Sequence, residues 1–229
     1  VALLFEQRNL ISAPVIDENN QLVGRITIDD VVDVIRDQAE HSVMSMVGLD
    51  EDEDVFAPII QSSKKRSIWL GVNLITAFIA VYFIGLFEAT LQQKIALAIL
   101  MPVVASMGGI AGTQTLIIVT RGIATGRVTT ANIKALINKE VAVSGLNGII
   151  WSIVIGLITY YWFSDMLLSL IIALAIITNL VVAAFSGAFL PLLLSKLRID
   201  PALAGGVILT TITDVIGFVA FLGLASLFI

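Results

Sequence analysis

An acidic residue stands near the middle of an apolar stretch at the end of the chain. Asp214 lies 11 residues into the run 203–229, which at 1.5 Å per residue is roughly 16 Å along a helix. Gly206, Thr210 and Asp214 share one helical stripe, and Thr211 lies beside it. Carboxylate, hydroxyl and backbone carbonyl oxygens are the ligands that hard divalent cations prefer. This stripe therefore predicts a cation site, the alternative being a neutral carboxyl bonded to a neighbouring helix.

A second apolar stretch combines small and polar residues. Gly108 and Gly112 form a GxxxG pair that runs into Thr113, Gln114 and Thr115. Such a pair indicates close helix packing, and it can also expose backbone oxygens to a water-filled path. The third stretch carries Glu140 and Asn147, which we interpret as further pore candidates. For Asn147 and for Asn179 the alternative is hydrogen bonding between helices.

Acidic side chains also gather near the beginning of the chain. Asp30, Asp33, Asp37 and Glu40 follow one another at spacings of three, four and three residues, so they share one face of a helix. A second acidic run, Asp50–Asp54, follows. Because neighbouring like charges repel, a regulatory divalent cation would stabilise this face. The alternative is a solvated acidic surface.

The composition indicates that these residues lie in membrane-spanning helices. The 229 residues are 58% hydrophobic and 14% charged, whereas soluble domains average roughly 45–50% apolar and about 25% charged residues. A bilayer core about 30 Å thick needs roughly 20 apolar residues per helix. We therefore expect an all-α polytopic membrane domain with five transmembrane helices. They are predicted at Ile68–Phe87, Lys94–Val119, Lys139–Phe163, Met166–Leu194 and Leu203–Ile229, the fourth with a tilt, kink or early end at Pro191.

Charge distribution orients the helices. If five spans alternate, nine lysines and arginines fall on the side of the N-terminus and only Lys94 falls on the other, so the positive-inside rule places the N-terminus in the cytoplasm and the C-terminus outside. The net charge of −5 argues against a nucleic acid partner. With no cysteine, a single histidine and no nucleophile–base pair, an enzyme is not expected.

The first residues predict a small α+β segment. Strands are expected at Pro14–Ile16 and Leu22–Ile28, followed by a helix capped by Asp29. The run PVIDENNQLVGRITIDDVVDVI resembles the end of a CBS module, whose nucleotide sites use residues aligning with Thr27 and Asp30. We interpret the segment as a structural unit and expect no nucleotide. The predicted organisation is a partial CBS-type cytoplasmic segment at 1–49, an acidic linker and connecting helix at 50–67, and the transmembrane domain at 68–229.

Three motifs carry a wider resemblance. MPVVASMGGIAGTQTLIIVTRGIATG, NKEVAVSGLNGIIW and DPALAGGVILTTITDVIGF, in this order, resemble the membrane domain of the MgtE family of magnesium channels. The resemblance implies a homodimer in a bacterial inner membrane, with a pore formed largely by the second and fifth spans and closed by the cytoplasmic head at high magnesium. Asp214 aligns with the family's pore aspartate, and Thr210 and Gly206 with pore positions near it. Ile110 replaces an asparagine that the family often has.

The resemblance implies transport of Mg²⁺ through a homodimeric pore that is gated by cytoplasmic Mg²⁺. Two copies would bring two Asp214 carboxylates to one axis, where they balance the charge of a divalent ion. Two other functions remain open. One is a sodium- or proton-coupled carrier of divalent cations, and the other is a CBS-type membrane sensor without transport. A central aspartate argues against the sensor, because a pure membrane anchor seldom retains one.

Overall fold

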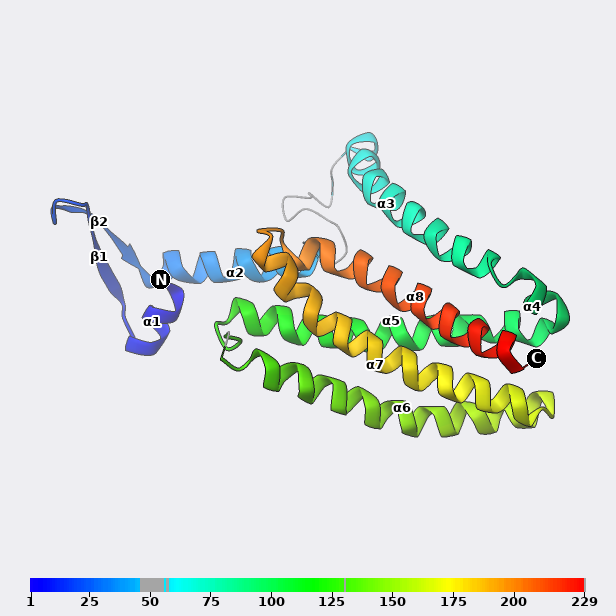
Figure 1. The fold of residues 1–229 in the computed structure, drawn as a ribbon. Helices are drawn as coiled ribbons and strands as arrows, with labels where there is room; N and C mark the ends of the chain where they lie inside the picture. Colours follow the sequence, from blue (N-terminus) through cyan, green and yellow to red (C-terminus); the bar gives the residue numbers. More distant parts are fainter. Residues whose placement is uncertain (46–55, 57, 130, 229) are drawn as a thin grey trace. The chain divides into compact units, whose positions relative to one another are not determined.

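A computed structural model describes the chain except residues 46–55, 57, 130 and 229 (Figure 1). The acidic run Asp50–Asp54 and residues 55 and 57 of the predicted linker therefore lie outside the described residues. The described chain forms two compact units, Val1–Ser62 and Ser63–Ile229.

The first unit contains a short helix, a β-hairpin and a longer helix. They are α1 (Ala2–Arg8), β1 (Ser12–Ile16), β2 (Leu22–Thr27) and α2 (Ile28–Ser45). The strands pair antiparallel, with Ser12 opposite Thr27. Asp17 closes the turn because its Oδ1 accepts hydrogen bonds from the backbone N–H groups of Asn19 and Gln21, both at 2.8 Å. The predicted pair of strands and the helix after them are confirmed.

The start of α2 differs from the prediction by two residues. The helix begins at Ile28, so Asp29 lies in its first turn and is not the cap. The terminus is closed instead by Thr27 and Asp30: Oδ2 of Asp30 accepts from both the backbone N–H and the hydroxyl of Thr27, each at 2.8 Å. These two bonds lower the pKa of Asp30 below its ordinary value. Because β2 ends at Thr27, the hairpin decides which residue occupies the cap.

The second unit consists of helices long and apolar enough to cross a membrane, joined by short connections. Five of its helices meet those criteria, as the sequence predicts, and a short helix lies between the first two. Their bounds are α3 (Ile59–Gly85), α4 (Glu88–Gln93), α5 (Ile95–Ala124), α6 (Ile133–Phe163), α7 (Met166–Lys196) and α8 (Pro201–Phe228).

Helix α7 is the centre of this unit. It packs against α5, α6 and α8, and half of its most apolar window is buried, a larger share than in any other span of the described chain. Small residues such as Ala175, Ala183 and Gly187 are among those buried, and they allow the neighbouring backbones to approach. Pro191 does not end the helix, which continues to Lys196. Membrane helices tolerate such prolines where packing satisfies the freed backbone groups.

Helix α3 packs very differently. Ala80 is the one residue of this helix that is buried, and large apolar side chains such as Ile68, Leu70 and Phe78 are more than 60% exposed. Exposed apolar side chains over a whole span are stable in contact with lipid or with another protein chain. This face is therefore available to the bilayer or to a second copy.

Candidate functional site

Asp214 lies on a partly open face of α8. Its side chain is half-buried, and Thr210 one turn earlier is exposed. A neighbouring stripe of α8 is the packed one, because Leu209 and Thr213 are fully buried. Within the described residues the Asp214 carboxylate has no hydrogen-bond or ion-pair partner, so no neighbouring helix of the same chain holds it there. An unpaired carboxylate at this depth is costly and calls for a compensating partner.

The hydroxyls around Asp214 donate to their own helix. Thr210 donates to the carbonyl oxygen of Gly206 at 3.0 Å, and Thr211 donates to that of Val207 at 2.8 Å. Each hydroxyl oxygen keeps lone pairs free to accept from the water shell of an ion. Gly206, Thr210 and Asp214 lie on one stripe of α8 with Thr211 beside it, and cation binding by these residues stays a prediction. One carboxylate does not neutralise a divalent cation, and the described residues contain no group of three or more acidic, histidine or cysteine side chains placed to hold a metal.

The glycines of α5 serve helix packing. Both Gly108 and Gly112 are buried. A Cβ atom at Gly108 would lie 2.2 Å from Nδ2 of Asn179, and one at Gly112 would lie 3.1 Å from Leu209. Each glycine therefore gives space to a side chain from another helix. These contacts agree with the helix-packing interpretation of the GxxxG pair. Direct contact of Gly108 or Gly112 with an ion stays a prediction.

Asn179 joins three helices, as its position in an apolar span predicts. Its side chain is fully buried, and its Nδ2 donates to the carbonyl oxygen of Val104 at 2.9 Å. A Cβ at Gly217 of α8 would lie 2.6 Å from the same nitrogen, so α5 and α8 both close around it. Oδ1 has no hydrogen-bond partner in the described part of the chain. Asn179 is therefore a packing residue: its Nδ2 group donates a hydrogen bond, and its Oδ1 atom accepts none from the described residues.

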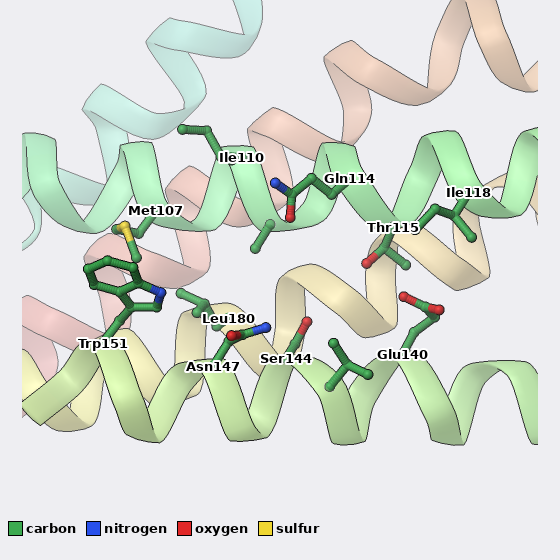
Figure 2. Close-up of a pocket in the computed structure, with 12 residues that line it drawn as sticks. Met107, Ile110, Gln114, Thr115, Ile118, Glu140, Ser144, Asn147, Trp151 and Leu180 are labelled. Atoms are coloured by element: carbon green, nitrogen blue, oxygen red, sulfur yellow. The ribbon is translucent and has the colours of Figure 1, made fainter.

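A cavity with polar and apolar lining lies between α5 and α6. Its volume is about 450 Å³, and Figure 2 shows Thr115 of α5 opposite Ser144 and Glu140 of α6, with their oxygen atoms turned toward the space between the helices. The cavity is lined from α5 by Met107, Ile110, Ala111, Gln114, Thr115 and Ile118, from α6 by Glu140, Val143, Ser144, Asn147 and Trp151, and from α7 by Leu180.

Three side chains in this cavity are more than nine-tenths buried. They are Thr115 at 3%, Glu140 at 5% and Ser144 at 7% exposure. Oε1 of Glu140 lies 3.2 Å from Nζ of Lys139, whose own side chain is two-thirds exposed. Sequence reasoning named Glu140 and Asn147 but missed their convergence with Thr115. The signal available was the spacing of Glu140, Ser144 and Asn147, which places three polar groups on one face of a helix.

The acidic face of α2 carries its own counter-charge. Arg36 lies 3.5 Å from Asp33 and 3.7 Å from Asp37, and all three side chains are about two-thirds exposed. Asp30 is engaged with Thr27 at the helix terminus, and the side chain of Glu40 lies outside the described residues. Arg36 relieves part of the charge repulsion that the sequence predicts between these acids. Metal binding at this face stays a prediction.

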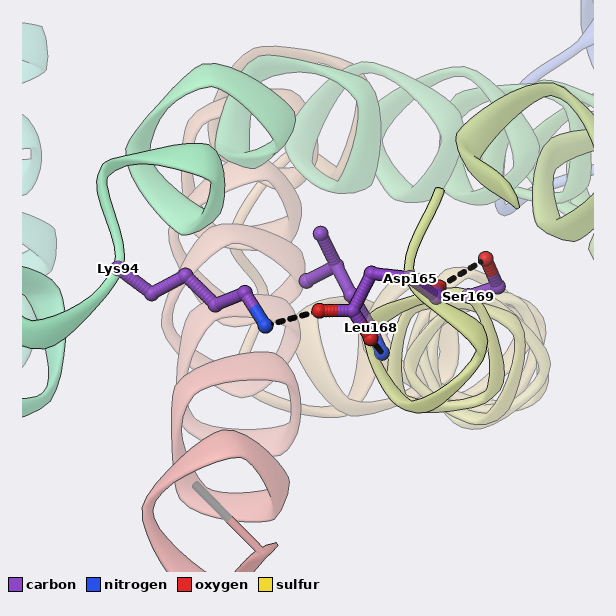
Figure 3. A network of polar contacts seen from close by, with 4 residues as sticks. All are labelled: Lys94, Asp165, Leu168 and Ser169. Atoms are coloured by element: carbon purple, nitrogen blue, oxygen red, sulfur yellow. Dashed lines mark hydrogen bonds and ion pairs between the residues drawn. The ribbon is translucent and has the colours of Figure 1, made fainter. Parts of the chain in front are cut away.

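An ion pair joins the α4–α5 connection to the α6–α7 connection. Nζ of Lys94, between α4 and α5, bonds to Oδ2 of Asp165, between α6 and α7 (Figure 3). The other carboxylate oxygen of Asp165 caps α7 by accepting from the N–H of Leu168 at 2.9 Å. The Lys94 ammonium, together with that backbone bond, holds the pKa of Asp165 below its ordinary value. This contact ties the start of α5 to the start of α7.

Five apolar helices among the described residues, one of which carries a carboxylate, define an α-helical multi-pass membrane protein. Comparison with known sequences makes the assignment specific, because residues 101–224 match the profile of the MgtE family, described as "Divalent cation transporter". The chain belongs to the MgtE family.

Individual relatives extend over the whole chain. It is 33% identical over 229 residues to the magnesium transporter MgtE of Bacillus subtilis and 30% identical over 230 residues to that of Thermus thermophilus. The protein of the same name from Enterococcus faecalis is 28% identical over 228 residues. The chain spans about half the length of these relatives, 50–51% of each. The match includes the first unit, which lies before the matched family profile.

Proposed function

We propose that this protein transports Mg²⁺ across the cell membrane through a homodimeric pore. The observation that carries the proposal is the half-buried Asp214 carboxylate, which has no partner within the described part of its own chain. The relatives with which the chain aligns are named magnesium transporters. A twofold axis beside this face of α8 would bring two carboxylates together, and their charge would balance that of one divalent ion.

The donor set suits a hydrated ion. Mg²⁺ requires near-octahedral oxygen ligation and gives up water reluctantly, so it is commonly held through one or two carboxylates while it keeps several waters. Asp214 supplies the charge, and the hydroxyl oxygens of Thr210 and Thr211 accept from the water shell. No closed cage of ligands surrounds Asp214 within the described chain. An ion held mainly through its waters can leave, which conduction requires.

The exposed face of α3 is consistent with this dimer, because a second copy would cover apolar surface that the chain itself leaves open. We propose a cytoplasmic N-terminus and an external C-terminus, since nine of the ten basic residues that flank the spans lie on the N-terminal side. Cytoplasmic Mg²⁺ bound at the acidic face of α2, through Asp33, Asp37 and Glu40, would reduce transport. We expect no nucleotide at Thr27 and Asp30, since these two side chains bond to each other.

The test is Mg²⁺ flux into liposomes that contain the purified protein. Asp214→Asn and Asp214→Ala are expected to abolish flux. Glu88→Gln removes an exposed carboxylate whose bond is to Gln92 at 3.1 Å within the same short helix, and it should transport normally. Near-normal flux in the Asp214 variants would overturn the proposal. Flux that follows an imposed sodium or proton gradient and ignores voltage would favour a coupled carrier, and a folded wild-type protein without flux would favour a sensor.

A further inference from the structure

The cavity between α5 and α6 contains oxygen atoms that the rest of the chain does not satisfy. Thr115 and Ser144 are more than nine-tenths buried, and neither hydroxyl has a hydrogen-bond partner among the described residues. Gln114 and Asn147 add two amides to the lining. Polar groups at membrane depth cost several kcal/mol each when nothing bonds to them. Water or another polar ligand that enters the cavity can therefore bond to these oxygen atoms.

The charge of the cavity selects a cation. Glu140 is the one ionisable group among the residues that line it, and its carboxylate is 5% exposed. Lys139 is its partner at 3.2 Å, yet the lysine side chain is two-thirds exposed. The ammonium can therefore turn away toward solvent when a stronger cation arrives. The lining hydroxyls of Thr115 and Ser144 and the amides of Gln114 and Asn147 can each present an oxygen atom.

The size of the cavity allows a hydrated ion. Water occupies about 30 Å³ per molecule, so six waters around a magnesium ion need roughly 180 Å³. The cavity holds about 450 Å³, which accommodates such an ion with additional water. Waters around the ion would donate to Thr115, Ser144, Asn147 and Gln114 while the carboxylate supplies the charge.

We propose that Glu140, Thr115, Ser144 and Asn147 form a second binding site for a hydrated divalent cation, separate from Asp214 and built within a single chain. The inference rests on the proposed transport of divalent cations. Glu140 lies near the start of α6 and Ile118 near the end of α5, so one end of the cavity lies toward the α5–α6 connection. By the charge distribution this connection is cytoplasmic, and the second site is therefore positioned to concentrate cations there.

Trp151 provides a local reporter because it lines the same cavity. The chain has three tryptophans, so Trp69→Phe and Trp162→Phe leave Trp151 as the sole emitter. The probe is Mn²⁺, a paramagnetic substitute for Mg²⁺, added to the full chain in lipid nanodiscs. Saturable quenching that excess Mg²⁺ reverses is expected. Asp214→Asn should leave this quenching unchanged, so a failure of the second site is distinguishable from a failure of the Asp214 site.

Two substitutions with opposite expected effects test the assignment. Glu140→Gln should weaken Mn²⁺ affinity by about 10–100-fold, the usual cost of losing an outer-shell group. Lys139→Gln removes the competing ammonium from an exposed position and should strengthen the affinity severalfold. Absent quenching, quenching unaffected by Glu140→Gln, or quenching lost in Asp214→Asn would each overturn the proposal. If quenching is absent and a photoreactive residue placed at position 151 cross-links to a second copy, a protein segment and not a cation fills the cavity.

Discussion

Asn179 of α7 donates its side-chain hydrogen to the carbonyl oxygen of Val104 of α5, 75 residues earlier in the chain, at 2.9 Å. The bond exists because Gly108 and Gly217 have no side chains: a Cβ at either position would lie 2.2 Å or 2.6 Å from the Asn179 nitrogen. Three helices thus meet around one amide. The two glycines make room for the amide that holds α5, α7 and α8 together.

The first prediction concerns this contact. Gly108→Ala should destabilise the protein by about 1–3 kcal/mol, because an added methyl group in a packed core forces its neighbours to move. Gly109→Ala is the matched control, since nothing lies within 4 Å of a Cβ built there. Thermal unfolding in detergent micelles measures both. Equal melting temperatures for the two variants would contradict the packing role.

The second prediction concerns the partner of that glycine. In an Asn179→Ala background the space in front of Gly108 is open, so Gly108→Ala should cost much less there than in the wild-type chain. The difference between the two costs is the coupling energy of a double-mutant cycle. Additive effects of the two substitutions would show that Gly108 and Asn179 act independently, against the geometry.

The third prediction concerns Lys94 and Asp165. Asp165→Ala should destabilise the protein by about 0.5–2 kcal/mol, the usual cost of losing an N-cap. Lys94→Met should cost less, because Asp165 still accepts from Leu168. Lys134→Met, at an exposed lysine, is the control, and urea unfolding of the protein in micelles provides the measurement. A larger loss in Lys94→Met than in Asp165→Ala would mean that the cap contributes little.

The same pair predicts a pH dependence. The pKa of Asp165 is lower in the folded chain than the ordinary 3.8 of an aspartate, so folding favours its ionised carboxylate. The stabilisation is present above that ordinary value and disappears as the pH falls through the folded pKa. Lys94→Met should raise the folded pKa of Asp165 and so reduce this acid-dependent loss. Stability measured against pH in both proteins checks the sign, and identical profiles would contradict it.

A fourth prediction concerns the start of α2. Asp30→Ala removes the acceptor for two bonds from Thr27 and should increase amide hydrogen exchange at Thr27 and over the first turn of α2. Asp29→Ala, one residue earlier and also exposed, is the matched control and should change exchange little. Faster exchange in Asp29→Ala than in Asp30→Ala would restore Asp29 as the cap.

A fifth prediction tests regulation by cytoplasmic cations. Replacing Asp33, Asp37 and Glu40 by their amides should weaken the inhibition of flux by Mg²⁺, because the face loses three negative charges. Arg36→Gln should strengthen the inhibition, since Arg36 lies 3.5 Å and 3.7 Å from the first two acids and competes with the ion. The inhibition constant in liposomes with controlled internal Mg²⁺ is the measurement. Unchanged inhibition in both variants would place the regulatory cation elsewhere.

Much of this protein follows from local properties of the sequence. The length of an apolar run and the thickness of a bilayer specify each span, so all five were located, with ends that differ by up to nine residues at the start of α3. Asp214 is recognisable without any structure, because a charge inside an apolar run is costly wherever the helix packs. The hairpin is also local, since Asp17 and its turn define the reversal.

Contacts between distant residues depend on the tertiary structure. Gly108 and Gly112 read equally well as packing or pore residues until α7 and α8 are placed against α5, and Asn179 and Leu209 then occupy the space in front of them. Thr115 and Glu140 become neighbours across a cavity only because α6 packs on α7 and leaves space beside α5. Helical periodicity defines the face of each side chain, whereas the packing of the helices decides which faces meet.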